Sequence, residues 1–200
     1  MNNKVMNRLS YGLFVLTAKD GDKDNGCIIN TAMQVTTSPN QIVITVNKGN
    51  YTHDMIAKTG EFNLSILDES AKFGTFQQFG FQSGRDVDKF AEITFARAEN
   101  GIAYLTKECS GYISGKVVQK VELSTHTMFI AEVTGGELLS DTPSVTYAYY
   151  HANIKPQAAP KEEKKGYICT ICGYIYEGDT LPADFVCPIC KHGAEDFKKL

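Results

Sequence analysis

The sequence reads Tyr167-Ile168-Cys169-Thr170-Ile171-Cys172-Gly173-Tyr174 and then Asp184-Phe185-Val186-Cys187-Pro188-Ile189-Cys190, and these two segments decide the fold of the C-terminal part of the chain. Each segment carries one C-x-x-C pair, and 14 residues lie between Cys172 and Cys187. Two pairs at this spacing can bind one tetrahedral metal ion through four thiolates, and the ion is then zinc or a single iron. We therefore predict a metal centre with the ligands Cys169, Cys172, Cys187 and Cys190.

The residues around the cysteine pairs narrow the choice of metal. Gly173 can adopt a positive φ and turn a backbone N–H toward a sulfur, and Pro188 stiffens the second pair. An aromatic core is predicted from Tyr167, Tyr174, Phe185 and Phe197. These features resemble rubredoxin, and the short gap resembles the rubredoxin-like tail of rubrerythrins, over about residues 166–200. The resemblance implies iron, with zinc as the alternative.

One position departs from the rubredoxin pattern. Lys191 and His192 follow the second pair, where a rubredoxin normally has glycine. We expect this departure to weaken the symmetry between the two metal-binding turns.

Composition and charge exclude several classes of partner. The net charge is −3 and no long basic run occurs, which argues against nucleic acid and anionic membranes. No apolar stretch approaches the roughly 20 residues that cross a bilayer, and the N-terminus lacks a secretion-signal pattern. We therefore expect a cytoplasmic protein, in which Cys27 and Cys109 are reduced, inert thiols.

The chain divides by composition into three parts. Residues 154–165 combine prolines with a Lys/Glu cluster, which predicts an exposed linker. Residues 166–200 are too few to fold on apolar burial alone, and a metal is the usual remedy. Residues 1–153 suffice for one domain with its own core.

The first domain is predicted to be mainly β with short helices. Helices are predicted over 53–58, capped by Thr52, and over 70–82, where Phe73, Phe76 and Phe79 face the core. A polar hairpin turn is predicted over 19–26. Strands are predicted over 11–18, 27–36, 41–46, 62–67, 93–97, 102–105, 109–123 and 126–139. Many strands with few helices indicate a mostly antiparallel barrel.

Three polar stretches of this domain suit an aromatic, anionic cofactor. Residues 30–39 offer amides and hydroxyls at a strand end, which can hydrogen-bond a flat heterocycle. Residues 47–53 place a lysine, amides and a hydroxyl at a helix N-terminus, where free N–H groups attract phosphate. Residues 83–90 add the guanidinium of Arg85 and the ammonium of Lys89. Each stretch alone also fits an ordinary turn, helix cap or solvated loop.

Together these stretches resemble the flavin reductase-like family, an FMN-binding split barrel. The likeness covers about residues 9–151 and is carried by Asn-Thr-x-x-Gln-Val-Thr, Asn-Lys-x-Asn-x-Thr-His, Ser-Gly-Arg-Asp-x-Asp-Lys-Phe and Thr-Tyr-Ala-Tyr-Tyr-His, which match flavoredoxin-like members. It implies a homodimer and an FMN ring against Asn30, Thr31, Gln34, Val35, Thr36, Thr37 and Ser38. It implies the phosphate near Asn47, Lys48, Asn50, Thr52, Ser83 and Arg85.

No Gly-x-Gly-x-x-Gly follows a strand, so no Rossmann site for a dinucleotide is predicted. NADH or NADPH can instead stack directly on the flavin in small reductases of this kind. Candidates to line that pocket are His53, His126 and His151, each of which also fits a structural role. No nucleophile–base pair is predicted, because the cofactor carries the chemistry.

A flavin-binding barrel joined to a rubredoxin-like tail resembles the high-molecular-weight rubredoxins. The resemblance implies an oxidoreductase in which NAD(P)H reduces FMN, and single electrons pass to a four-cysteine iron centre. The acceptor implied is a protein such as a flavodiiron oxygen or nitric oxide reductase. Two alternatives stay open: a free flavin or ferric reductase with an accessory tail, and a non-enzymatic module whose zinc ribbon mediates contacts.

Overall fold

The computed structural model describes residues 5, 8–156, 166–171, 173–188 and 191–200. The chain divides into two compact units, Met1–Pro156 and Gln157–Leu200. Most of the predicted linker, residues 157–165, lies outside the described residues. Among the described residues, no helix combines the length and the apolar character that crossing a membrane requires.

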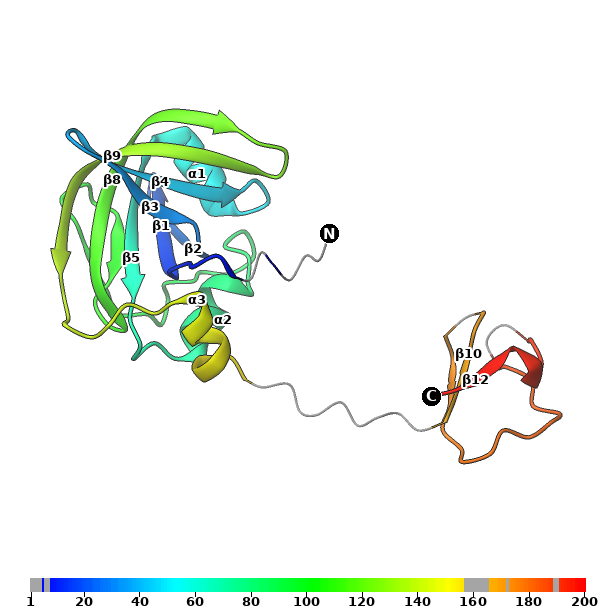
Figure 1. The fold of residues 1–200 in the computed structure, drawn as a ribbon. Coiled ribbons are helices and arrows are strands. Elements are labelled where there is room, and N and C mark those ends of the chain that lie inside the picture. The colour runs from blue at the N-terminus through cyan, green and yellow to red at the C-terminus, as the bar shows by residue number, and fades with distance from the viewer. Residues whose placement is uncertain (1–4, 6–7, 157–165, 172, 189–190) are drawn as a thin grey trace. The chain divides into compact units, whose positions relative to one another are not determined.

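One antiparallel sheet of seven strands forms the first unit (Figure 1). The strands are β1 (Phe14–Asp20), β2 (Lys23–Ile29), β3 (Ala32–Thr37), β4 (Asn40–Asn47), β5 (Glu61–Leu67), β8 (Cys109–Glu122) and β9 (His126–Leu138). Their order in the sheet is β2-β1-β5-β8-β9-β4-β3. The two edge strands, β2 and β3, are therefore neighbours in the chain that lie at opposite ends of the sheet.

The structure corrects the predicted path of the chain between residues 19 and 37. The expected hairpin over 19–26 is a tight turn at Gly21 and Asp22, because β1 and β2 pair up to Asp20 and Lys23. The strand predicted over 27–36 is two strands, since the chain leaves one sheet edge at Ile29 and joins the other at Ala32. The alternation of apolar and polar residues along a segment does not reveal a change of the strand with which it pairs.

The sheet rolls around one apolar core. Buried side chains of β2 and β4, which stand near opposite edges, belong to the same cluster as Phe62 and Phe129. The helix α1 (Tyr51–Thr59) adds Met55 and Ile56 to this cluster. The result is a split barrel: its edges meet through packed side chains, while the hydrogen-bonded ladder stays open between β2 and β3.

A second apolar cluster covers the opposite side of β1 and β5. It is built from α2 (Phe73–Gly80), the hairpin of β6 (Phe95–Arg97) and β7 (Ala103–Leu105), and the helices α3 (Tyr147–Tyr149) and η2 (Tyr150–Ile154). Phe76 and Phe79 are buried here, as predicted. In Figure 1, α2 and α3 lie together, apart from α1.

The start of α1 differs from the prediction. Asn50, and not Thr52, is the N-cap residue. Thr52 lies inside the helix, fully buried, where its hydroxyl accepts a hydrogen bond from the Asn25 amide at 2.9 Å. The Thr52 hydroxyl, which was expected to cap the helix, therefore binds Asn25 of β2 instead.

The second unit is a small three-stranded sheet in the order β11 (Ile175–Tyr176), β10 (Tyr167–Cys169), β12 (Phe197–Lys199), preceded at β12 by the short helix η3 (Ala194–Asp196). The predicted aromatic core is present: Cys169, Cys187 and Phe197 form a buried cluster. The rings packed around it are Tyr167, Tyr174, Tyr176 and Phe185.

The barrel core allows a direct test of stability. Phe62 is fully buried, so Phe62→Ala should lower the free energy of unfolding by about 3–5 kcal/mol through lost burial and the cavity it leaves. Phe81 is 67% exposed, and Phe81→Ala should change stability by no more than about 0.5 kcal/mol. Urea unfolding followed by circular dichroism measures both, and equal losses would contradict the assignment of the core.

Candidate functional site

A small polar cavity of about 80 Å³ lies at the N-terminus of α1. Three segments line it: β2, the residues that begin α1, and the loop that follows α2. Four of the predicted cofactor residues meet here, namely Asn50, Thr52, Ser83 and Lys89. The fold thus brings the second and third polar stretches of the sequence to one place.

Lys89 gives the cavity a buried positive charge. The side chain is only 3% exposed, and its ammonium donates hydrogen bonds to the carbonyls of Gly26 at 2.9 Å and Phe79 at 3.0 Å. Burial lowers the pKa of Lys89. Within the described residues no carboxylate pairs with it. A buried ammonium bound only to carbonyls favours an anion in the space beside it.

The walls of the cavity are held by packing between β2 and the loop. Asn25 is 2% exposed and donates to the Thr52 hydroxyl. Gly84 packs so closely on Asn25 that a Cβ at this position would overlap the amide. The Asn50 side chain makes no capping hydrogen bond, so the N–H groups of Tyr51 and Thr52 at the start of α1 can bind a ligand. The roles of Asn25 and Gly84 were not predicted, because they depend on contacts between segments that are distant in the sequence.

Cys27 also lines this cavity and was not predicted as a site residue. Burial raises the pKa of Cys27 to about 11, although a hydrogen bond with Thr52 acts in the opposite direction. Burial likewise raises the pKa of Cys109. The two thiols lie in different core clusters and form no disulfide, so both are neutral at physiological pH.

Arg85 lies at the rim, not inside the small cavity. Its Nη2 is 2.5 Å from Asp54 Oδ2, its Nη1 donates to the Gly49 carbonyl at 3.3 Å, and its guanidinium stands over the Tyr51 ring at 5.0 Å. The residue lines a neighbouring open cavity of about 610 Å³. An exposed guanidinium with a carboxylate partner is a weaker anchor for an anion than a buried ammonium without one.

A chain of polar contacts connects this rim to the β8–β9 hairpin. Asp54 Oδ1 is 3.0 Å from His53 Nδ1, and His53 Nε2 is 2.9 Å from the hydroxyl of Thr127. Thr127 donates to Glu122 at 3.2 Å, and Glu122 pairs with Lys48 at 2.8 Å, which lowers the pKa of Glu122.

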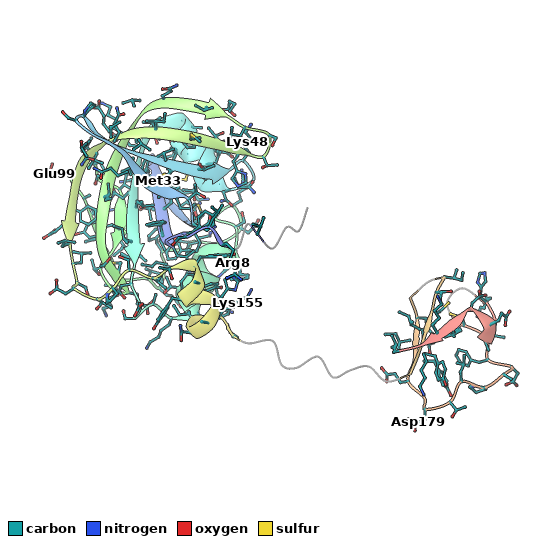
Figure 2. The ribbon with its side chains drawn as sticks, in the orientation of Figure 1. Arg8, Met33, Lys48, Glu99, Lys155 and Asp179 are labelled. Carbon is teal, nitrogen blue, oxygen red and sulfur yellow. The ribbon has the colours of Figure 1, made fainter. Side chains whose placement is uncertain are left out.

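Lys48 therefore lies beside the β8–β9 turn, as its label in Figure 2 shows, and outside the small cavity. The Asn47 side chain stabilises the turn between β4 and α1, where its Oδ1 accepts a hydrogen bond from Gly49 N at 2.8 Å.

The residues of the first polar stretch do not line the small cavity. Gln34 lines a larger, mainly apolar cavity of about 580 Å³ between β3, β4, β5, β8 and β9. Its amide donates to Asn40 Oδ1 at 2.8 Å. Asn30 and Thr31 form the link between β2 and β3, and Thr31 donates to Asn30 Oδ1 at 3.1 Å. The remaining predicted residues, Val35, Thr36, Thr37 and Ser38, are exposed along β3 and its turn.

The three predicted histidines do not gather in one pocket. His53 belongs to the polar chain above, and Nδ1 of His126 is 2.8 Å from the Thr125 hydroxyl. His151 packs against Tyr147 and Tyr150, with ring centroids 4.6 and 5.3 Å away. None of these three described side chains lines the cavity of about 80 Å³ or the cavity of about 580 Å³.

Two turns with the same backbone hydrogen bonds form the candidate metal centre. In the first knuckle, residues 169–174, Gly173 N donates to Cys169 O at 2.9 Å and Cys169 N donates to Tyr174 O at 2.8 Å. In the second, residues 187–192, Lys191 N donates to Cys187 O at 3.0 Å and Cys187 N donates to His192 O at 2.8 Å.

In the backbone that the structure describes, the expected loss of symmetry between the knuckles is not observed. Lys191 adopts φ 63°, close to the φ 77° of Gly173. Cys169 and Cys187 are buried together, while Cys172 and Cys190 lie outside the described residues. Paired soft thiols on matched turns fit a tetrahedral metal ion of the kind predicted.

Comparison with known families supports both units. The "Flavin reductase like domain" family matches residues 6–157, and the "Rubrerythrin, rubredoxin-like domain" family matches residues 167–198. A high molecular weight rubredoxin of Moorella thermoacetica is 36% identical over 229 residues, which covers 100% of both chains. A ferric-chelate reductase (NAD(P)H) of Archaeoglobus fulgidus is 32% identical over 76% of this chain and 89% of its own.

Solved structures show the same fold for the first unit. Flavoredoxin from Methanosarcina acetivorans superposes with a TM-score of 0.59 at 24% identity, over 64% of this chain and 69% of its own. An NADH:FAD oxidoreductase from Streptomyces globisporus superposes with a TM-score of 0.65 at 21% identity, over 72% and 84%.

The environment of Cys27 predicts low reactivity. A pKa raised to about 11 from an ordinary 9.0 leaves about a hundredfold less thiolate at pH 8. Alkylation of Cys27 by iodoacetamide should therefore be at least about a hundredfold slower in the folded chain than in urea. Peptide mass spectrometry separates Cys27 from the other cysteines, and similar rates in both states would show that the thiol is not buried in solution.

Proposed function

Because this chain belongs to the flavin reductase-like domain family and ends in a rubredoxin-like domain, we propose that it is an electron-transfer flavo-rubredoxin. In this proposal NAD(P)H reduces FMN held by residues 1–153, and electrons pass singly to an iron held by residues 166–200. The final acceptor is a protein, of the flavodiiron oxygen or nitric oxide reductase type. The alignment with a high molecular weight rubredoxin over the full length of both chains supports the proposal.

The observation that carries the flavin half is the small cavity at the start of α1. Its buried ammonium on Lys89 and the hydroxyls of Thr52 and Ser83 suit a monoester phosphate, which is doubly charged and accepts several hydrogen bonds. Asn50 and the N-terminus of α1 complete the set. Arg85 contributes from the rim once Asp54 releases it.

The cavity of about 580 Å³ between β3, β4, β5, β8 and β9 suits the flavin ring. Its lining is mainly apolar, with Gln34 as a polar group at one side, and its size is that of a cofactor pocket. Met33 and Leu138 at its border are 61% and 84% exposed, which supports a homodimer that covers this surface. Bound flavin would supply the conversion between hydride transfer and single-electron transfer, and bound iron would accept one electron at a time.

The charge of the tail suits a brief encounter with a basic acceptor protein in the cytoplasm. From residue 167 onward, five carboxylates stand against three lysines, before the charge of the thiolates is counted. The carboxylates are Glu177, Asp179, Asp184, Glu195 and Asp196, and the lysines are Lys191, Lys198 and Lys199. Such a surface steers association at low salt and loses this effect as salt rises.

A second candidate function is reduction of a small acceptor, such as ferric chelate or free flavin, by the barrel alone. The ferric-chelate reductase relative, which matches 76% of this chain, favours it. If FMN stays bound to the protein during gel filtration, that result would argue against a free-flavin reductase. A visible spectrum with metal analysis separates iron, whose ferric tetrathiolate absorbs beyond the flavin bands, from silent zinc.

The phosphate assignment predicts a difference between two flavins. Lys89→Met removes the ammonium and keeps an unbranched side chain, so FMN should bind more weakly by about 1–3 kcal/mol. Riboflavin lacks the phosphate and should keep its affinity. Lys58→Met, at an exposed lysine paired with Asp20, should change neither. Fluorescence titration measures all four affinities, and equal losses for FMN and riboflavin would assign Lys89 a purely structural role.

The route of the electrons predicts the effect of removing the tail. A chain that ends at Pro156 should still oxidise NAD(P)H with ferricyanide and should fail to reduce the acceptor protein. The full-length Cys169→Ser variant should behave in the same way, since it lacks a ligand. The separate tail should restore only part of the rate, because the covalent connection raises the local concentration to about millimolar. A truncated chain that reduces the acceptor at the full rate would contradict the proposal.

A further inference from the structure

Two residues of the described chain other than glycine have a left-handed backbone, Glu108 (φ 60°) and Lys191 (φ 63°). L side chains adopt this conformation at a cost, so each position calls for a compensating interaction. For Glu108 the compensation is a hydrogen-bonded carboxylate. Its Oε2 accepts from Lys72 N at 3.1 Å and from the Thr75 hydroxyl at 2.6 Å, at the start of α2.

Lys191 has no comparable compensation within its own unit. Its side chain is exposed, and in the part of the chain that the structure describes its ammonium has no hydrogen-bond or ion-pair partner. Glycine meets the same backbone requirement at the matching position of the first knuckle, where Gly173 donates the equivalent hydrogen bond. The conformation of the second knuckle therefore does not require a lysine.

What distinguishes lysine from glycine here is a positive charge on the residue next to a predicted metal ligand. Lys191 directly follows the predicted ligand Cys190, and neither knuckle sequence contains another lysine or arginine. A metal ion bound by four thiolates carries net negative charge, and reduction of ferric to ferrous iron adds one more negative charge. A nearby cation stabilises the reduced state more than the oxidised state.

We propose that Lys191 sets the reduction potential of the metal centre. Its ammonium raises the potential of the bound iron, and the left-handed backbone that places it there lowers the stability of the second knuckle. The inference rests on the proposed function in one respect, since it requires that the centre binds iron. The strain at Lys191 is independent of which metal is bound.

Three substitutions in the full-length chain separate charge from backbone strain. Lys191→Gln removes the charge and keeps the strain, Lys191→Gly removes both, and Lys191→Arg keeps both. Spectroelectrochemistry of the iron-loaded protein should give a lower midpoint potential for Lys191→Gln and Lys191→Gly, and an unchanged one for Lys191→Arg. The differences should shrink at high salt, because an exposed charge is screened.

Stability is measured on zinc-loaded protein, where no redox change occurs. Lys191→Gly should release zinc to a chelator several-fold more slowly than Lys191→Gln, because both variants lack the charge and only Lys191→Gln keeps the strain, whereas Lys191→Arg should match the parent. Unchanged potentials in both uncharged variants would overturn the role of the charge. A lower potential in Lys191→Gly alone would assign the effect to the backbone and overturn it too.

Equal rates of zinc release from Lys191→Gly and Lys191→Gln would show that the strained conformation is absent in solution. A chain that binds zinc and does not bind iron would remove the potential-setting role together with the proposed iron. The rates of zinc release would still decide whether the knuckle is strained, so failure of the proposed function is distinguishable from failure of this inference.

Discussion

The candidate site depends on how the backbone of β2, at the edge of the sheet, is hydrogen-bonded. This strand ends the sheet, and buried backbone groups without a partner are costly. The ammonium of Lys89 binds the Gly26 carbonyl at this edge and the Phe79 carbonyl of α2, and so holds the loop after α2 across the strand. The same ammonium lines the cavity at the start of α1. Attachment of the loop to this edge and the capacity to bind an anion therefore rest on one side chain.

The two units are stabilised in different ways. The barrel has an apolar cluster on each side of β1 and β5, and these give it a core of its own. Among the described residues of the tail, the buried apolar cluster consists of Cys169, Cys187 and Phe197, surrounded by partly exposed rings. A unit with so small a core gains much of its folding free energy from the metal it binds. The proposed redox centre is in this sense also the core of its domain.

The basic residues around α1 divide by burial into two groups. Arg85 and Lys48 are partly exposed, and each has a carboxylate partner in the polar contacts that run along α1 to the β8–β9 hairpin. Lys89 is buried and binds carbonyls only. Screened surface pairs contribute little, whereas a buried charge strongly favours a counter-ion. This contrast assigns Lys89, ahead of the other two, to the candidate phosphate site.

The metal-binding cysteine pairs, the aromatic core of the tail, the burial of Phe76 and Phe79, and most strands could be predicted from the sequence, because each depends on spacing along a single segment. The tertiary structure alone decided which distant segments meet. It divided the strand predicted over 27–36 between two sheet edges and made Asn25 and Cys27 walls of the cavity. It also directed Lys89, and not Lys48, toward the cavity. Burial of a side chain depends on contacts such as that of Lys89 with Gly26, which local spacing does not encode.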